Sequence, residues 1–185
     1  TTTALIGLIL KKAGFKPNEK MVVVGMGGSG LAPLLIKTWK PECDISIKKD
    51  YGLPDMDSAE LKNKLVILSS YSGTTEEVIE AFHQAKEKNL EIAAISIGRT
   101  LLDLAKEHSV PYVQMPDNGF QSRMAQGYSL RGFLKLMGEE EALKETRKLA
   151  EDLDPLEYEE RGKKLAEKLR GSVPVIYSSA RNLSI

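Results

Sequence analysis

Apolar residues follow two alternating patterns along most of this chain. Short apolar runs, several of them rich in β-branched residues, are typical of buried strands in a parallel sheet. They occupy residues 21–24, 45–47, 65–68, 92–97 and 110–113. Between many of them, apolar residues recur at helical spacing. This alternation predicts an α/β fold: a three-layer αβα sandwich in which a doubly wound parallel sheet has helices on both faces.

Four helices are predicted between or after these strands. The first begins after Ser29 and ends before Pro41, and the second follows the strand at 65–68 and ends at Asn89. A short helix is expected at 101–108 and a longer one at 122–137. The predicted apolar stripes are Leu31, Leu34, Leu35 and Thr38 in the first helix, Val78, Ile79, Phe82 and Ala85 in the second, and Ala125, Tyr128, Leu130, Phe133 and Leu134 in the last.

The composition changes at Gly138, beyond which Glu, Lys and Arg dominate. Two amphipathic helices separated by Pro155 are expected here, followed by a strand that enters a turn at 173–180. Their apolar positions are Leu143, Ala150 and Leu153 in the first helix and Tyr158, Leu165, Ala166 and Leu169 in the second. A parallel strand needs both faces covered. We therefore expect a first domain at 1–153, and at 154–185 a linker helix with the first strand of a truncated second domain.

The composition excludes several classes of protein. Hydrophobic residues make up 42% of the 185 residues and charged residues 28%, as in ordinary folded domains, and no apolar run is long enough to cross a bilayer. The 26 basic and 26 acidic residues balance, so we expect no nucleic-acid partner. Cys43 is the only cysteine, which excludes an internal disulfide framework. The apolar stretch at 1–10 lacks signal-peptide features and is interpreted as a helix, which favours a cytoplasmic location.

The candidate chemistry lies in two turns, each placed between a predicted strand and a predicted helix. Residues 25–30 read Gly-Met-Gly-Gly-Ser-Gly, and residues 69–75 read Ser-Ser-Tyr-Ser-Gly-Thr-Thr. A helix N-terminus has unpaired amides and a partial positive charge, so it favours an anion such as phosphate. Glycine lets the backbone approach the ligand, and hydroxyl groups donate further hydrogen bonds. The candidate phosphate ligands are Gly28, Ser29, Ser70, Ser72 and Thr75.

Each turn taken alone has a structural explanation. A glycine-rich junction is common between a strand and a helix, and Thr74 with Glu77 has the spacing of a capping box. Two such turns in one small sheet favour a ligand, because ligands of these sheets bind beyond the carboxyl ends of the strands. The turn at 25–30 also fits a dinucleotide fingerprint, with Asp50 downstream. That alternative, a nicotinamide-binding Rossmann domain, gives the second turn no role, and we expect no cofactor and no metal.

The two turns and residues 116–123 resemble, in order and spacing, the sugar isomerase (SIS) domain family, which is flavodoxin-like in fold. The motifs are Gly-Met-Gly-Gly-Ser-Gly at 25–30 and Ser-Tyr-Ser-Gly-Thr-Thr-Glu-Glu at 70–77. The closer similarity is to the bifunctional phosphoglucose/phosphomannose isomerases. It covers roughly residues 20–135, and residues 173–180 resemble the opening of that family's second domain. The resemblance implies binding of a sugar phosphate.

The resemblance also implies a reaction. An arginine after a proline-bearing loop lies beside the sugar in that family, and Arg123 is the matching position, although Ser122 replaces the usual preceding proline. Conversion between an aldose and a ketose phosphate passes through an enediolate, whose charge a fixed guanidinium would stabilise. Glucose 6-phosphate or mannose 6-phosphate would thus interconvert with fructose 6-phosphate, with Arg123 as a catalytic residue.

The family's catalytic base and ring-opening histidine come from beyond the first domain, the histidine often from a partner subunit. They have no counterpart in this chain, and His83 and His108 fit helix positions better than a site. The chain alone would therefore bind substrate but lack the base, and a homodimer is expected. The other hypothesis is a non-catalytic phosphosugar-binding regulatory domain. A DNA-binding segment beside the domain would favour the regulator, and this chain shows none.

Overall fold

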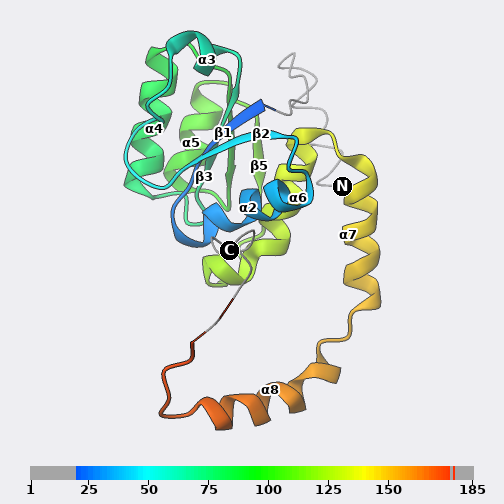
Figure 1. Ribbon diagram of the computed structural model, residues 1–185. Helices are drawn as coiled ribbons and strands as arrows, with labels where there is room; N and C mark the ends of the chain where they lie inside the picture. The colour runs from blue at the N-terminus through cyan, green and yellow to red at the C-terminus, as the bar shows by residue number, and fades with distance from the viewer. Residues whose placement is uncertain (1–19, 176, 178–185) are drawn as a thin grey trace.

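A computed structural model describes residues 20–175 and residue 177 of the chain (Figure 1). Five strands form one parallel sheet in the order β2-β1-β3-β4-β5. They are β1 (Lys20–Val24), β2 (Asp44–Lys48), β3 (Leu65–Ser69), β4 (Ile92–Ser96) and β5 (Tyr112–Gln114). This is the flavodoxin-like order, in which the winding reverses between β1 and β3. The predicted fold class is confirmed.

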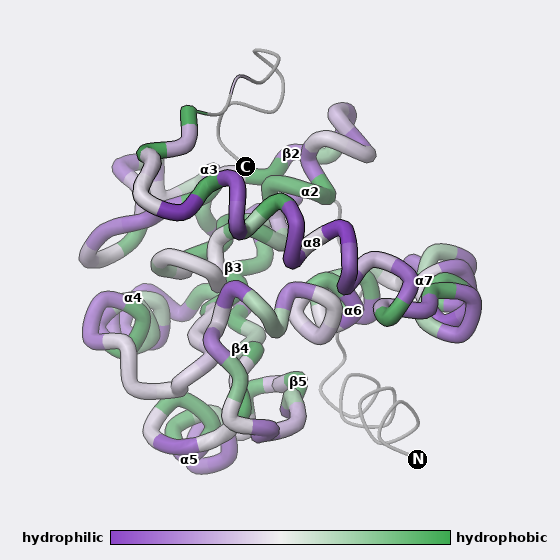
Figure 2. The backbone as a smooth tube through the Cα atoms, turned by 90° about the horizontal axis from the view of Figure 1, so that it is seen from below, coloured by the Kyte–Doolittle hydropathy of each residue, from purple (hydrophilic) through white to green (hydrophobic). Residues whose placement is uncertain are grey.

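Helices cover both faces of the sheet. The described α-helices are α2 (Leu31–Trp39), α3 (Ser58–Lys62), α4 (Glu76–Glu87), α5 (Arg99–Glu107), α6 (Gln126–Met137), α7 (Glu140–Asp152) and α8 (Leu156–Leu169), with two 3₁₀ turns, η1 (Gly27–Gly30) and η2 (Ser122–Ala125). Seen along the strands, α4 and α5 lie on one side of the sheet and α2 and α6 on the other (Figure 2).

Alternate residues of the strands supply the two halves of the core. Met21 and Val23 of β1 belong to a buried cluster with residues of α2 and α6, whereas Val22 and Val24 belong to a second cluster with residues of α3, α4 and α5. The period of two along a strand places successive side chains on opposite faces of the sheet. Because both faces are covered, every residue of β3 and β4 is buried.

Two predictions about the helices need correction. The apolar stripe of α2 is wrong, because its buried residues are Ala32, Pro33 and Ile36, while Leu35 is exposed. Apolar residues fill every position from 31 to 36, so the pattern could not fix how the helix is rotated. The sequence analysis also missed α3. The residue that could have indicated α3 is Asp57 at its N-cap, because its carboxylate accepts a hydrogen bond from the Ala59 amide at 2.9 Å.

The charged segment after Gly138 forms the two predicted helices, α7 and α8, which pack very differently. Ala142 and Leu143 of α7 pack against Leu134 and Leu130 of α6. No residue of α8 is buried. Its predicted apolar positions are all exposed, as are Ala150 and Leu153. In Figure 1, α8 lies apart from the sheet.

The described part of the segment predicted as a strand at 173–180, residues 173–175 and 177, has no strand structure. A strand requires a neighbouring strand for its hydrogen bonds, and the described sheet ends at β5 and β2. The rest of that segment and the helix predicted at 1–10 lie outside the described residues. Among the described residues, none of the helices has the length and apolar character of a membrane span.

Candidate functional site

The two predicted turns meet at the carboxyl ends of β1 and β3, which are adjacent in the sheet. The Tyr71 amide donates a hydrogen bond to Ser29 Oγ at 3.0 Å, and Ser69 Oγ donates to the Ser29 carbonyl oxygen at 3.3 Å. These bonds join residues about 40 positions apart in the chain. A hydroxyl group can both accept and donate, so Ser29 keeps a proton for a ligand.

The first turn passes through η1 before α2 begins, with Gly27 at a φ of 50°. Its Gly28 is held against the segment that carries the predicted arginine. A Cβ at Gly28 would lie 2.8 Å from the Arg123 amide nitrogen and 2.8 Å from Ser122 Oγ, so no larger residue fits without a shift. Gln126 Nε2 also donates to the Gly28 carbonyl oxygen at 2.8 Å. Gly28 therefore joins the first turn to η2.

The second turn is organised by Ser70, which is almost fully buried. Ser70 Oγ lies 2.7 Å from Thr75 Oγ1 and accepts a hydrogen bond from the Gly73 amide at 3.0 Å. The N-cap of α4 is Thr75, and no side chain caps it. The capping box considered for Thr74 and Glu77 is therefore not formed. The hydroxyl groups of this turn bond to one another instead of capping the helix.

The turns open onto a pocket of about 370 Å³. Of the predicted phosphate ligands, Ser29, Ser72 and Thr75 line it. Gly28 and Ser70 do not. The lining comes from four segments: Met26 and Ser29 of the first turn, Tyr71, Ser72 and Thr75 of the second, Ile97 and Arg99 after β4, and Asp117 with residues 119–122 before α6.

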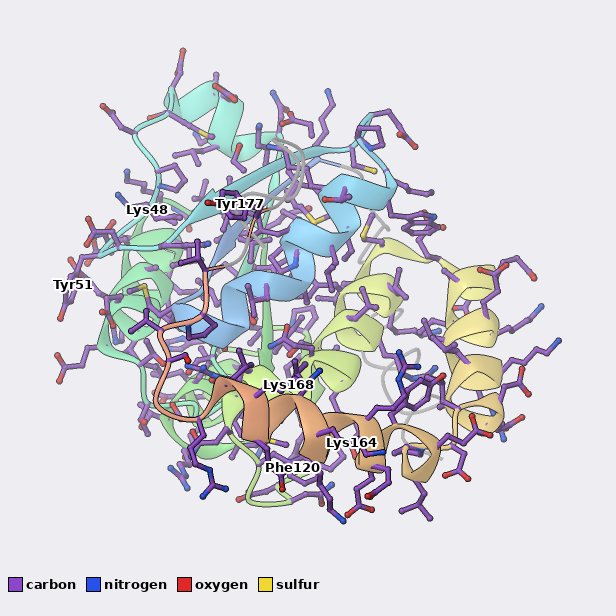
Figure 3. All side chains as sticks on the ribbon, turned by 60° about the horizontal axis from the view of Figure 1, so that its bottom comes forward. Lys48, Tyr51, Phe120, Lys164, Lys168 and Tyr177 are labelled. Atoms are coloured by element: carbon purple, nitrogen blue, oxygen red, sulfur yellow. The ribbon has the colours of Figure 1, made fainter. Side chains whose placement is uncertain are left out.

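The segment at 116–123, which carries the predicted arginine, reaches the same pocket. Ser122 lines it, whereas the next residue, Arg123, is exposed and does not. Among the described residues, the Arg123 side chain has no ion pair. Phe120 belongs to the same loop and is 43% exposed (Figure 3). The structure thus brings the three predicted motifs together at one pocket, but Arg123 itself is not among the lining residues.

The sequence analysis gave no role of their own to Arg99 and Tyr71, which are among the residues that line the pocket. Arg99 follows β4 at the first position of α5, and the signal was available, because the carboxyl end of β4 lies beside that of β3. Tyr71 was treated only as part of a motif. Its hydroxyl is buried and makes no hydrogen bond within the described part of the chain.

The charges around the pocket are mixed. Arg99 and Asp117 line it, and Glu76 and Glu77 occupy the first turn of α4 beside it. The negative charge of Glu77 and then of Glu76 raises the pKa of the Tyr51 phenol, which lies beside α4 at the edge of the molecule (Figure 3). Tyr51 Oη also donates to Glu76 Oε2 at 3.3 Å. Within the described residues, no cluster of His, Cys, Asp and Glu has the arrangement of a metal site.

Comparison with known structures defines the class of fold. A hypothetical protein of Thermus thermophilus matches 74% of this chain and 37% of its own, with a TM-score of 0.52 at 17% identity. A Silicibacter pomeroyi protein that is provisionally named a phosphosugar isomerase is also similar, with a TM-score of 0.51 at 12% identity. The match covers 81% of this chain and 47% of that protein. The fold is therefore of the SIS type. No protein-family model matches the chain.

Sequence comparison finds named relatives of this chain. A bifunctional phosphoglucose/phosphomannose isomerase of Aquifex aeolicus is 31% identical over 169 residues, which are 88% of this chain and 51% of that protein. The same enzyme of Caldicellulosiruptor bescii is 33% identical over 175 residues, 86% of this chain and 50% of that protein. The resemblance predicted from the motifs is confirmed: this chain is related to the bifunctional phosphoglucose/phosphomannose isomerases. It spans about half the length of these relatives.

Proposed function

We propose that this chain is the sugar-phosphate-binding part of an aldose–ketose isomerase, which interconverts glucose 6-phosphate or mannose 6-phosphate with fructose 6-phosphate. One observation carries the proposal: hydroxyl groups of both predicted turns line a single pocket at the switch point of the sheet. Pockets at this place in doubly wound sheets are the usual ligand sites. The names of the sequence relatives supply the reaction.

In this proposal, the phosphate lies between Ser29, Ser72 and Thr75. Each offers a hydroxyl group at the pocket, and Thr75 stands at the N-terminus of α4, where unpaired amides add hydrogen bonds. Ser70 fixes the second turn through Thr75 and Gly73, and Gly28 allows the first turn to meet η2. These two residues would act mainly by shaping the site.

The reaction would remove a proton beside the sugar's carbonyl group and return it to the neighbouring carbon. Arg123 is proposed to stabilise the enediolate between these two steps, with its guanidinium turned toward the sugar. The base and the ring-opening group would come from outside this chain. Within the described residues, His83 and His108 lie near Phe82, with ring centroids 5.9 and 5.7 Å away, and neither lines the pocket. A homodimer is proposed for the complete enzyme.

We also propose the domain division at residue 153. The apolar side chains of α8 need a cover that the described residues do not provide. The sequence relatives are about twice as long as the matched region. A second α/β unit would cover α8 and give residues 173–180 the neighbouring strands that they need.

Calorimetric titration tests the binding. Fructose 6-phosphate and a sugar hydroxamate phosphate, which mimics the enediolate, should both bind this chain, while fructose without its phosphate should bind far more weakly. The proposal fails if neither phosphate binds this chain and neither binds the longer protein that contains it.

A substitution at Ser72 tests the position of the phosphate. We expect Ser72→Ala to weaken fructose 6-phosphate binding by about 1 to 3 kcal/mol, because the anion loses one hydrogen bond. Ser58→Ala is the matched control: it is the same substitution at an exposed serine that does not line the pocket. Equal affinity of the Ser72 variant and the wild type in the same titration would place the phosphate elsewhere.

A further inference from the structure

The geometry points to Arg99 as the residue that supplies the positive charge for the sugar's phosphate group. This inference rests on the proposed function, because it concerns the same pocket and the same ligand. The motifs of the two turns consist of neutral hydroxyl groups and amides, and Arg99 belongs to neither of them.

The charges near the second turn call for such a cation. A phosphate placed at the N-terminus of α4 lies close to Glu76 and Glu77, whose negative charges oppose its own. Asp117 adds a further carboxylate to the lining. Among the described lining residues, Arg99 is the only cationic side chain. Hydroxyl groups and amides satisfy the oxygen atoms of a phosphate, but they do not offset these three carboxylates.

Arg99 is held next to the second turn by the backbone. The Leu101 amide donates to the Gly73 carbonyl oxygen at 2.9 Å, which ties the first turn of α5 to the turn that carries Ser72. A Cβ at Gly73 would lie only 2.0 Å from the Gly98 carbonyl oxygen, so the two turns are in direct contact. Ser96 Oγ donates to that same carbonyl oxygen at 3.1 Å. The backbone of Arg99 is therefore fixed beside the proposed phosphate position, and its side chain extends from there.

The side chain of Arg99 is not used by the rest of the fold. It is exposed, and within the described residues it has no ion pair and no hydrogen bond. Its backbone has a φ of 59°, in the left-handed region that glycine or asparagine adopts more readily. Strained positions of this kind gather at ligand sites, where the surrounding structure holds them. Binding of an anion gives a reason for a long cationic side chain at a position where glycine would be less strained.

The strained backbone allows a clean experiment. Arg99→Asn removes the charge and suits the left-handed conformation, so the variant should fold with a melting temperature equal to or above that of the wild type. Arg99→Lys keeps a charge at the same position. Lys106→Asn is the matched control, because it removes the same charge from the other end of α5, outside the pocket.

Titration of all four proteins with fructose 6-phosphate gives the readout. We expect Arg99→Asn to raise Kd roughly 10- to 100-fold, since a hydrogen-bonded charge pair is lost, and Arg99→Lys and Lys106→Asn to stay within roughly threefold of the wild type. Raising the salt concentration should weaken wild-type binding more than binding to the Arg99→Asn variant, because one screened charge pair is absent. A purely structural role would change neither this salt dependence nor the preference for the charged ligand.

The outcomes separate this inference from the proposed function. If wild-type protein binds fructose 6-phosphate and Arg99→Asn binds equally well, Arg99 does not hold the phosphate, and the proposed function stands. If affinity falls for the Asn variant with an unchanged salt dependence, the ion pair is also disproved. If the wild type itself fails to bind, the proposed function is wrong, and this inference fails with it.

Discussion

Helices α4 and α8 have similar amphipathic patterns and opposite environments. Helix α4 buries Val78, Ala81, Phe82 and Ala85 against the sheet, whereas α8 buries no residue and leaves Leu156 73% exposed. The pattern predicted both helices correctly. It also implied an apolar face in need of a partner, but only α4 has that partner within the described residues. An amphipathic helix therefore indicates that a cover is needed without saying where the cover comes from.

The difference has a simple cause in chain connectivity. Helix α4 joins β3 to β4, two adjacent parallel strands, and such a crossover must return across the sheet, so its apolar face is placed on the core. Helix α8 follows α7 and joins no strands of the described sheet. Nothing in its local connection forces it onto a surface.

Core truncations should give the largest contrast between the two helices. Phe82→Ala removes a fully buried ring and should lower the free energy of unfolding by about 3 to 5 kcal/mol. Leu165→Ala, at a side chain 56% exposed, should change it by less than about 0.5 kcal/mol. Urea unfolding followed by circular dichroism measures both. A loss at Leu165 as large as that at Phe82 would mean that the α8 face is covered in solution, and a dependence on protein concentration would identify a second copy as the cover.

Glycine-to-alanine substitutions before α4 and within α8 should change the stability of the protein in opposite directions, by the next largest amounts. Gly73→Ala should destabilise the protein by about 3 kcal/mol, because its Cβ would meet the Gly98 carbonyl oxygen at 2.0 Å and its φ of 75° disfavours a side chain. Gly162→Ala in α8 has open space around the new Cβ and should stabilise the helix by about 0.5 to 1 kcal/mol. Thermal unfolding checks both signs. A neutral Gly73 variant would contradict the tight contact between the second turn and Gly98.

Substitutions in the first turns of α4 and α8 should give the smallest effect, a shift in the pKa of one exposed tyrosine. Glu77, more than Glu76, raises the pKa of Tyr51, so Glu77→Gln should lower that pKa toward its ordinary value. In the wild type, the folded state holds the Tyr51 proton more tightly than the unfolded state does, so this contribution to stability is lost as the pH rises through the tyrosine range. Ultraviolet titration of the phenol, with Tyr51→Phe as the reference, measures the shift. Glu157→Gln in the first turn of α8 is the control and should leave the titration of Tyr51 as it is in the wild type.

Much of the fold could be predicted because its signals are local. The runs at 21–24, 65–68 and 92–97 form the buried strands β1, β3 and β4 to within one residue at each end, and their alternation with helices fixes a parallel sheet by the rules of connection. Local signals failed where apolar residues were too many, as in α2, or the element was too short, as in α3. The rotation of α2 depends on its contact with α6, which no local pattern contains.

The candidate site was predicted in part. Ser29, Ser72 and Thr75 line the pocket, as expected from two turns at adjacent strand ends. Ser70 has the same residue type and the same motif, yet its hydroxyl is buried beneath the turn. Arg99 lies outside every motif used in the sequence analysis. Residue type and spacing thus located the turns, but the direction of each side chain followed from contacts between segments far apart in the chain.

Residues close together in the chain specify the strands and most of the helices, the parallel sheet and the two turns, and for this reason the sequence was enough to predict them. Contacts between distant segments set the remaining features: Gly28 meets Ser122, Ser29 bonds to Tyr71, and Arg99 lines the same pocket as the two turns. These pairings depend on which strand ends lie side by side once the sheet has formed. They form only when the whole sheet and its helices have packed, so no short stretch of the sequence predicts them.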